Sequence, residues 1–171
     1  MSKAGLFLLL FCFLSSCQDD TATTTTYYLI RHAEKERGPA AGDDPPLTDQ
    51  GKERADFWAT YFMDKKLDAV YSTNTIRTRA TAAPTAEEFG VSISDYSTRN
   101  LYSNNFQKET RGQNVLIVGH SDTTPEFVNK IIGRQRFTAI NDNEYGNVYR
   151  VIVNNGKSEV EKKLINNWDN F

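Results

Sequence analysis

The chain has 171 residues, of which 39% are hydrophobic, and a formal net charge of −2 at pH 7. This length suits one compact domain with an adequate core, and an acidic balance without a basic run gives no support for nucleic-acid binding. Its two cysteines, Cys12 and Cys17, lie in or beside an N-terminal apolar segment. Stability of the domain that follows therefore owes nothing to an internal disulfide.

The N-terminal segment has the features of an export leader. Lys3 gives a short positive start, and residues 6–14 form an apolar run that is too short for a typical transmembrane helix. Leu14-Ser15-Ser16-Cys17 then resembles a bacterial lipobox, which implies cleavage before Cys17 and lipidation of its sulfur. The alternative is an ordinary secretory signal with an incidental cysteine, and either one exports the protein.

The expected organisation follows from this leader. We expect a lipoprotein signal peptide at 1–16, a polar tether at 17–26 that contains a threonine run, and one folded domain at 27–171. A lipid anchor at Cys17 would hold the protein in the bacterial cell envelope, on the periplasmic face or at the cell surface.

The first predicted strand, residues 27–31, ends in Arg31 and His32. Its continuous apolar run is typical of a strand buried on both faces, and open parallel sheets bind ligands beyond the carboxyl ends of their strands. Arginine presents a fork of donors that matches phosphoryl oxygens, and neutral imidazole can attack phosphorus and later leave. Without further signals, a chance Arg-His pair at a strand end would explain the dipeptide equally well.

A helix over 49–64 and a strand over 68–71 come next. Thr48 suits the N-cap of that helix and Asp49 its positive start. A second helix is predicted over 75–89, with Arg77 in the first turn, where free amides and the helix dipole already favour an anion. A basic residue is poorly placed there for helix stability, so Arg77 indicates a ligand. Arg79 is interpreted as part of a solvated or ion-paired face.

The second histidine, His120, follows a predicted buried strand over 115–118. Pro125 suits the first turn of a helix over 124–132, and Gly133 suits its end. Both histidines are therefore expected at the carboxyl ends of buried strands, at the same edge of the sheet.

The other elements complete an α/β fold. Strands are predicted near 91–94, at 147–153 and at 159–165, and 98–112 is expected to be irregular. Asn154-Asn155-Gly156-Lys157 indicates a hairpin turn. The expected architecture has three layers: a mainly parallel central sheet with helices on both faces, and an antiparallel hairpin at the C-terminal end.

Four segments together resemble the histidine phosphatase superfamily, which contains phosphoglycerate mutases and phosphohistidine phosphatases. They are Arg31-His32, Pro46-Leu47-Thr48, Arg77 with Thr81 four residues later, and Val118-Gly119-His120-Ser121. The resemblance implies a phosphoglycerate mutase-like fold and a phosphohistidine intermediate on His32. It also implies that Arg31, Arg77 and His120 bind the phosphoryl group, without a metal or other cofactor. No cysteine or spare histidine remains for a metal site, although an all-carboxylate site stays open.

The acid that protonates the leaving group is not obvious. Many superfamily members carry a glutamate after the second arginine, whereas residues 100–105 contain no carboxylate here. Asp122 is the first candidate, because a carboxyl beside the phosphate could protonate the departing oxygen, but it could equally cap the next helix. Glu34 is the second candidate, and it could instead form a local ion pair with Lys35.

The resemblance implies an exported phosphomonoester hydrolase that acts on a phosphorylated small molecule, an envelope sugar or a phosphoprotein. We expect an open pocket entered over the segment beyond Arg31 and over residues 96–113 and 137–145, with Asp142, Glu144 and Tyr145 shaping the rim. An inactive module that binds phosphate groups is the rival interpretation. A phosphomutase is disfavoured, because it needs a closed site that keeps its intermediate away from water.

Overall fold

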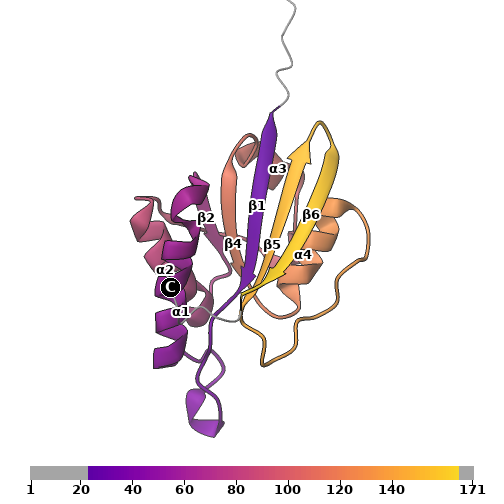
Figure 1. Cartoon of the computed structure of the whole chain (residues 1–171). Helices are drawn as coiled ribbons and strands as arrows, with labels where there is room; N and C mark the ends of the chain where they lie inside the picture. The colour runs from indigo at the N-terminus through magenta and orange to yellow at the C-terminus, as the bar shows by residue number, and fades with distance from the viewer. Residues whose placement is uncertain (1–22, 166–171) are drawn as a thin grey trace, which may run out of the picture.

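A computed structural model describes residues 23–165 (Figure 1). The predicted signal peptide, Cys17 and most of the predicted tether lie outside this range. The strands are β1 (Thr24–Arg31), β2 (Ala69–Ser72), β3 (Ile93–Asp95), β4 (Asn114–Gly119), β5 (Asn147–Asn154) and β6 (Lys157–Leu164). The α-helices are α1 (Asp49–Phe62), α2 (Ile76–Glu88), α3 (Asn104–Glu109) and α4 (Thr123–Ile132). Short 3-10 helices are η1 (Pro39–Ala41), η2 (Met63–Lys65) and η3 (Thr98–Asn100). No helix within 23–165 is both long and apolar enough to cross a membrane.

The six strands form one sheet in the order β3-β2-β4-β1-β5-β6. The first four of these run parallel, β5 is antiparallel to β1, and β6 is antiparallel to β5. The predicted hairpin turn is present between β5 and β6, where Asn155 and Gly156 have φ of 49° and 73°. Two successive positive φ angles match the right-handed twist of a hairpin. The mainly parallel sheet with an antiparallel C-terminal hairpin is thus confirmed.

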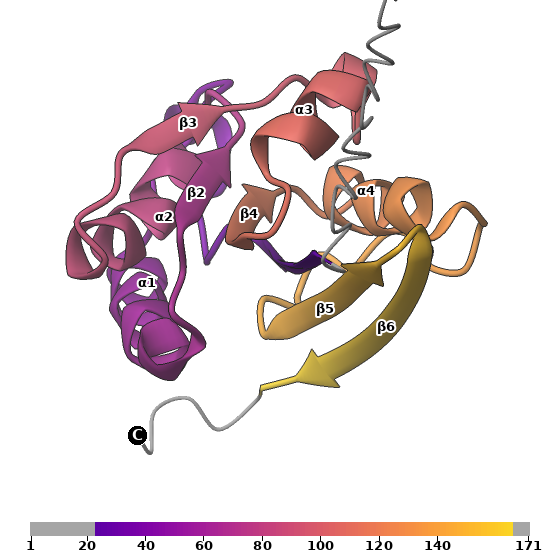
Figure 2. The same ribbon diagram turned by 90° about the horizontal axis from the view of Figure 1, so that it is seen from above.

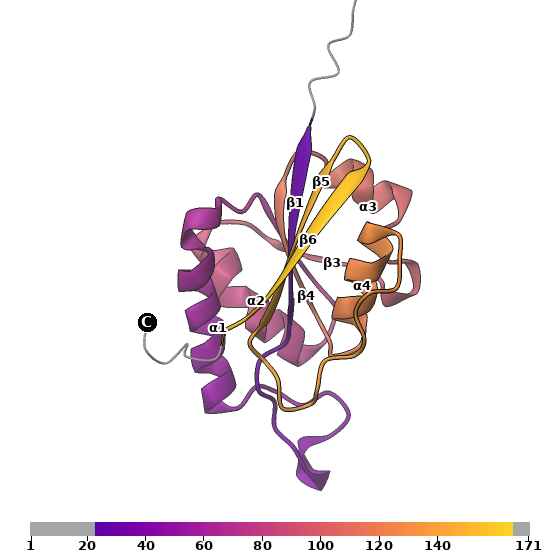
Figure 3. The same ribbon diagram turned by 45° about the vertical axis from the view of Figure 1, so that its right-hand side comes forward.

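Helices cover both faces of the sheet, with α1 and α2 on one side and α3 and α4 on the other (Figures 2 and 3). Alternate residues of β1 supply the two cores. Tyr28 and Ile30 pack in the cluster that includes Trp58 of α1, whereas Tyr27 and Leu29 belong to the cluster of α3 and α4. This period of two is the geometry of a strand buried on both faces, and it confirms the predicted three layers.

Strand β1 begins three residues earlier than predicted, so Thr24–Thr26 belongs to the sheet and not to a tether. Thr25 and Thr26 are buried, and Thr26 is paired with Asn114 of β4 and Ile152 of β5. Threonine is β-branched and fits a pleated sheet, so its run favours a strand once two neighbours flank it. The prediction of a tether rested only on the polarity of the threonine run.

The stretch 98–112 is not irregular, because it contains η3 and α3. Ser103 caps α3, since its Oγ accepts the Phe106 N–H at 3.2 Å. Phe106 is the one buried residue of this short helix, and its ring stacks near Tyr27 with centroids 6.0 Å apart. One apolar residue in a two-turn helix leaves no periodicity to detect, which explains the wrong prediction.

Candidate active site

A pocket of about 610 Å³ lies at the carboxyl ends of β1 and β4. The structure brings the predicted nucleophile and the three predicted phosphate-binding side chains into it: His32 and Arg31 from the end of β1, Arg77 from the first turn of α2, and His120 from the end of β4. The full lining is Arg31, His32, Lys35, Thr73, Thr75, Arg77, Thr98, His120, Ser121, Asp122, Thr123 and Asp142. Every lining residue is polar or charged.

His32 is held in one orientation and one tautomer. Its backbone N–H donates to Gly119 O at 2.8 Å, which joins the two histidine-bearing segments. Its Nδ1 lies 2.8 Å from Ala33 O. A carbonyl can only accept, so Nδ1 carries the proton and the lone pair is on Nε2. Burial, with the nearby charge of Arg31, lowers the pKa of His32 to about 3. The imidazole is therefore uncharged at neutral pH, as a nucleophile must be.

His120 faces His32, with the ring centroids 5.5 Å apart. An Arg77 terminal nitrogen donates to His120 Nδ1 at 3.3 Å, so Nδ1 is the acceptor. The proton is then on Nε2, which lies 2.9 Å from Thr73 Oγ1. Burial and the charge of Arg77 lower the pKa of His120. Its imidazole is thus a neutral hydrogen-bonding group beside the proposed nucleophile.

Arg77 has a partner that the sequence did not indicate. One Asp44 oxygen accepts from Arg77 Nη1 at 2.9 Å, and the other accepts from the Ile76 N–H at 3.0 Å. The start of α2 therefore attracts an anion, as predicted, and Asp44 supplies one from the loop between β1 and α1. Arg79 pairs with exposed Asp95, which confirms the interpretation of an ion-paired face.

Arg31 is buried, and the loop 141–145 holds its guanidinium group through hydrogen bonds, an ion pair and an aromatic ring. Its Nη1 donates to Asn141 O at 2.9 Å and to Glu144 O at 3.2 Å. Its Nη2 lies 3.4 Å from an Asp142 oxygen, and its guanidinium carbon lies 4.6 Å from the centre of the Tyr145 ring. Of the three residues predicted to shape the rim, Asp142 lines the pocket, whereas Glu144 and Tyr145 contact Arg31 and are not among the lining residues.

Each of the two arginines has one side-chain nitrogen that no described residue pairs with. The Nε atoms of Arg31 and Arg77 are buried and have no hydrogen-bond partner among the described residues. Lys35 also lines the pocket, without an ion pair in the described part of the chain. From the sequence, Lys35 was expected only as a possible ion-pair partner of Glu34. Its position three residues beyond His32 was the available signal.

The two candidate acids lie in different surroundings. Asp122 lines the pocket, and its Oδ1 also accepts the Thr123 N–H at 2.7 Å as the N-cap of α4. Glu34 is absent from the described pocket lining and is paired with Arg54 of α1, whose nitrogens lie 2.6 to 2.9 Å from its two oxygens. The Glu34 alternative is therefore wrong in position, and its partner is Arg54, not Lys35.

The predicted entrance is partly wrong. Thr98 and Asp142 do line the pocket. Residues 102–113, however, lie at the opposite end of the sheet, where the Gly112 N–H donates to Thr25 Oγ1 near the start of β1. A chain that returns to begin parallel strand β4 must cross to that end, which removes α3 from the substrate path. Within 23–165, no group of three His, Cys, Asp or Glu side chains is arranged to hold a metal ion.

The state of His32 predicts a pH dependence of stability. Between pH 6.5 and about 3, the unfolded chain binds a proton at His32 that the folded protein does not. The free energy of unfolding must therefore fall as pH falls through this window. We expect the wild type to lose about 2 kcal/mol more than His32→Asn between pH 7 and pH 5, as measured by urea unfolding. Equal losses in the two proteins would contradict the lowered pKa.

Comparisons with known proteins agree with this architecture. Residues 27–98 match the model of the histidine phosphatase superfamily (branch 1), a range that contains Arg31, His32 and Arg77. A search of the curated proteins found no sequence match. Among solved structures, Bacillus stearothermophilus YhfR is similar, with a TM-score of 0.64 at 18% identity, over 80% of this chain and 95% of that one.

Two further structures have named activities. Phosphoglycerate mutase from Bacillus anthracis str. Sterne superposes with a TM-score of 0.62 at 14% identity, over 83% of this chain and 93% of its own. A phosphoserine phosphatase from Entamoeba histolytica, in complex with phosphoserine, superposes with a TM-score of 0.60 at 14% sequence identity. The superposition covers 80% of this chain and 94% of that one. At these identities the likeness establishes the fold. The chain thus has the phosphoglycerate mutase-like α/β fold, and its residues 27–98 carry the sequence pattern of the histidine phosphatase superfamily.

Proposed function

We propose that this protein is a phosphomonoester hydrolase that works through a phosphohistidine on His32. The observation that carries the proposal is the state of that side chain: buried, uncharged, and fixed by Ala33 O so that Nε2 holds the lone pair. It lies in a pocket that two arginines, Arg31 and Arg77, also line. A nucleophile and anion donors in one water-accessible pocket suit phosphoryl transfer.

The proposed reaction has two displacements. His32 Nε2 forms a bond to phosphorus while the bond from phosphorus to the ester oxygen breaks, and that oxygen takes a proton from Asp122. Water then attacks the phosphohistidine, Asp122 takes a proton from the water, and phosphate leaves with His32 restored. Arg31 and Arg77 donate charge-assisted hydrogen bonds to the phosphoryl oxygens, where negative charge is greatest in the transition state, and His120 would turn its Nε2–H from Thr73 Oγ1 toward the same oxygens.

The proposed substrates are phosphorylated small molecules, envelope sugars or phosphoproteins. Every residue of the pocket lining is polar or charged, and the hydroxyls of Thr73, Thr75 and Ser121 suit a hydrated leaving group. A rim built from exposed loops suits a substrate that is large or attached to a polymer.

We propose that the protein is exported and anchored to a membrane through Cys17, because Leu14-Ser15-Ser16-Cys17 resembles a lipobox. We expect the full chain expressed in a bacterium to sediment with membranes, and Cys17→Ala to leave the membrane fraction or keep an uncleaved leader. Radiolabelled palmitate should label only the wild type. Labelling that persists in Cys17→Ala would place the lipid elsewhere.

The test of the proposed function is phosphate release from an aryl phosphate by the full chain, together with chemical trapping of phosphohistidine. A hydrolase releases free phosphate and forms a covalent intermediate. A phosphate-binding module forms none, although it would still bind phosphate. A phosphomutase would pass the phosphoryl group to an added acceptor ester faster than to water, so the three functions give different products.

A further inference from the structure

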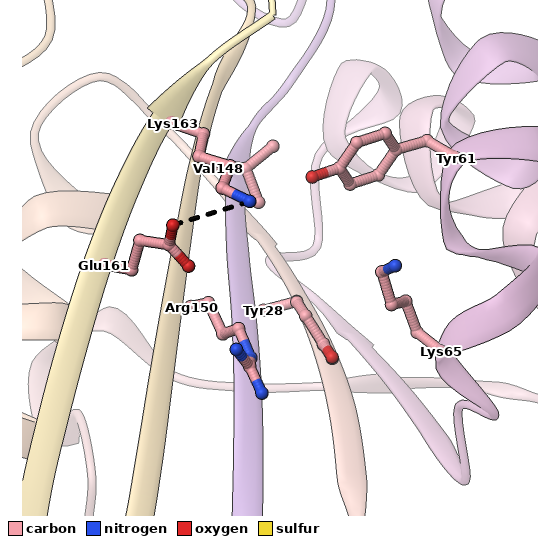
Figure 4. A pocket seen from close by; sticks show the side chains of 7 residues that line it. All are labelled: Tyr28, Tyr61, Lys65, Val148, Arg150, Glu161 and Lys163. Atoms are coloured by element: carbon pink, nitrogen blue, oxygen red, sulfur yellow. Dashed lines mark ion pairs between the residues drawn. The ribbon is translucent and has the colours of Figure 1, made fainter.

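A second, smaller pocket lies away from the proposed active site, between α1 and the β5-β6 hairpin (Figure 4). Its volume is about 240 Å³, and we call it the basic groove. The groove is lined by Tyr28 of β1, Tyr61 of α1, Lys65 of η2, Val148 and Arg150 of β5, and Glu161 and Lys163 of β6. None of these residues lines the pocket that holds His32.

Strand alternation explains why polar side chains gather there. Tyr149, Val151 and Val160 point toward α4 and join its core cluster. The residues between them point to the other face, where Tyr28, Arg150 and Glu161 form one cross-strand row, and Val148 and Lys163 form the next. Helices α1 and α2 stand over β2, β4 and β1, and no described helix lies over β5 and β6 on this side (Figure 2). Residues 23–165 therefore leave this part of the sheet uncovered by a helix.

The groove has more donors than acceptors. Lys163 pairs with Glu161 at 3.4 Å, and Lys65 pairs with Asp64. Arg150 has no ion pair among the described residues, and the hydroxyls of Tyr28 and Tyr61 make no hydrogen bond within that part of the chain. A surplus of positive charge in one concavity contrasts with the net charge of −2 for the whole chain. Charge complementarity therefore favours an anion.

We infer that the basic groove binds a small oxyanion with two or more negative charges. Its volume of about 240 Å³ corresponds to roughly eight water molecules, which excludes a folded partner or a long peptide from the concavity. Arg150 supplies a bidentate fork for a phosphate or carboxylate group, Lys65 and Lys163 add charge, and the phenols of Tyr28 in β1 and Tyr61 in α1 can donate hydrogen bonds. Phosphate-type and carboxylate-type ligands share this chemistry.

The test is a titration of the ¹⁵N-labelled full chain with two small anions, in which the chemical shifts of the backbone amides report binding. The probes are methylenediphosphonate, which cannot be hydrolysed, and citrate. We expect saturable shifts at Tyr28, Arg150 and Lys163 with at least one probe. Arg150→Gln should weaken this binding about tenfold, because it removes a charge-assisted pair of hydrogen bonds. Arg134→Gln makes the same change at another exposed position and should leave the affinity within about twofold.

Each outcome decides the inference. Binding of both probes that depends on Arg150 supports a general oxyanion site, and binding of one alone identifies the phosphate or carboxylate source. Shifts confined to the surroundings of His32, or binding that Arg150→Gln does not weaken, would overturn it. So would Arg150-dependent binding to phosphatidylglycerol vesicles without binding of either free probe. Phosphate release by Arg150→Gln should equal that of the wild type. Absence of anion binding in the basic groove can therefore be told apart from absence of phosphatase activity at His32.

Discussion

His32→Ala should lose phosphate release from an aryl phosphate, with kcat reduced on the order of 10⁴-fold or more. Of the two neutral imidazoles in the described pocket, His32 is the one with a lone pair left for attack, because Nδ1 of His120 accepts from Arg77 and its Nε2 carries the proton. The His32→Ala variant keeps both arginines, so it should still bind phosphate. Only the formation of the covalent intermediate should be lost. Single-turnover release and phosphohistidine trapping measure these two properties separately.

Two variants serve as controls for that experiment. His120→Ala removes a donor but not the nucleophile, so it should lower kcat by about 10²- to 10³-fold and still form phosphohistidine. Asp122→Asn should form phosphohistidine from an aryl phosphate within a few-fold of the wild-type rate, because that leaving group needs little protonation, and should form it much more slowly from an alkyl phosphate. If His32→Ala kept the wild-type rate, the proposed mechanism would be refuted. An inactive wild type that still bound phosphate would favour the binding module.

Local patterns in the sequence predicted much of this pocket. A buried strand must end at the edge of the sheet, so the residues that follow it, His32 and His120, are brought together by topology alone. The position of Arg77 followed from the start of its helix. In each case the decisive information lay within about ten residues of the functional side chain, where strand and helix periodicity is readable.

Features that depend on contacts between distant segments were missed. Asp44 reaches Arg77 from 33 residues away, and Arg54 reaches Glu34 from 20. The loop that carries Asp44 contains Gly42 with φ of 69°, and no periodic pattern specifies where such a loop returns. Helix α3 was missed for a different reason, because its single buried residue, Phe106, provides no repeat. Such placements are set by tertiary packing and leave little local trace.

Gly51 lies where the first turn of α1 approaches the chain just beyond the nucleophile. A Cβ built on Gly51 would stand 2.1 Å from Glu34 O and 3.0 Å from the Glu34 carbonyl carbon. The same oxygen accepts the Thr48 N–H at 3.0 Å, so a hydrogen bond links the N-terminus of α1 to the segment that follows β1. Because the obstacle is backbone, an added methyl group must move either the helix or the segment that fixes His32.

Gly51→Ala should therefore destabilise the protein by about 2 kcal/mol and lower activity at least about tenfold. Helix propensity alone predicts the opposite sign, a gain of about 1 kcal/mol for alanine over glycine inside a helix. Urea unfolding followed by circular dichroism decides between the two, with exposed Gln50→Ala as a neighbouring control that should stay within about 0.5 kcal/mol of the wild type. A more stable and fully active Gly51→Ala would mean that α1 does not rest on Glu34. A less stable and less active one would show that the start of this helix positions the catalytic strand end, since the displaced carbonyl follows directly after the Ala33 carbonyl that orients His32.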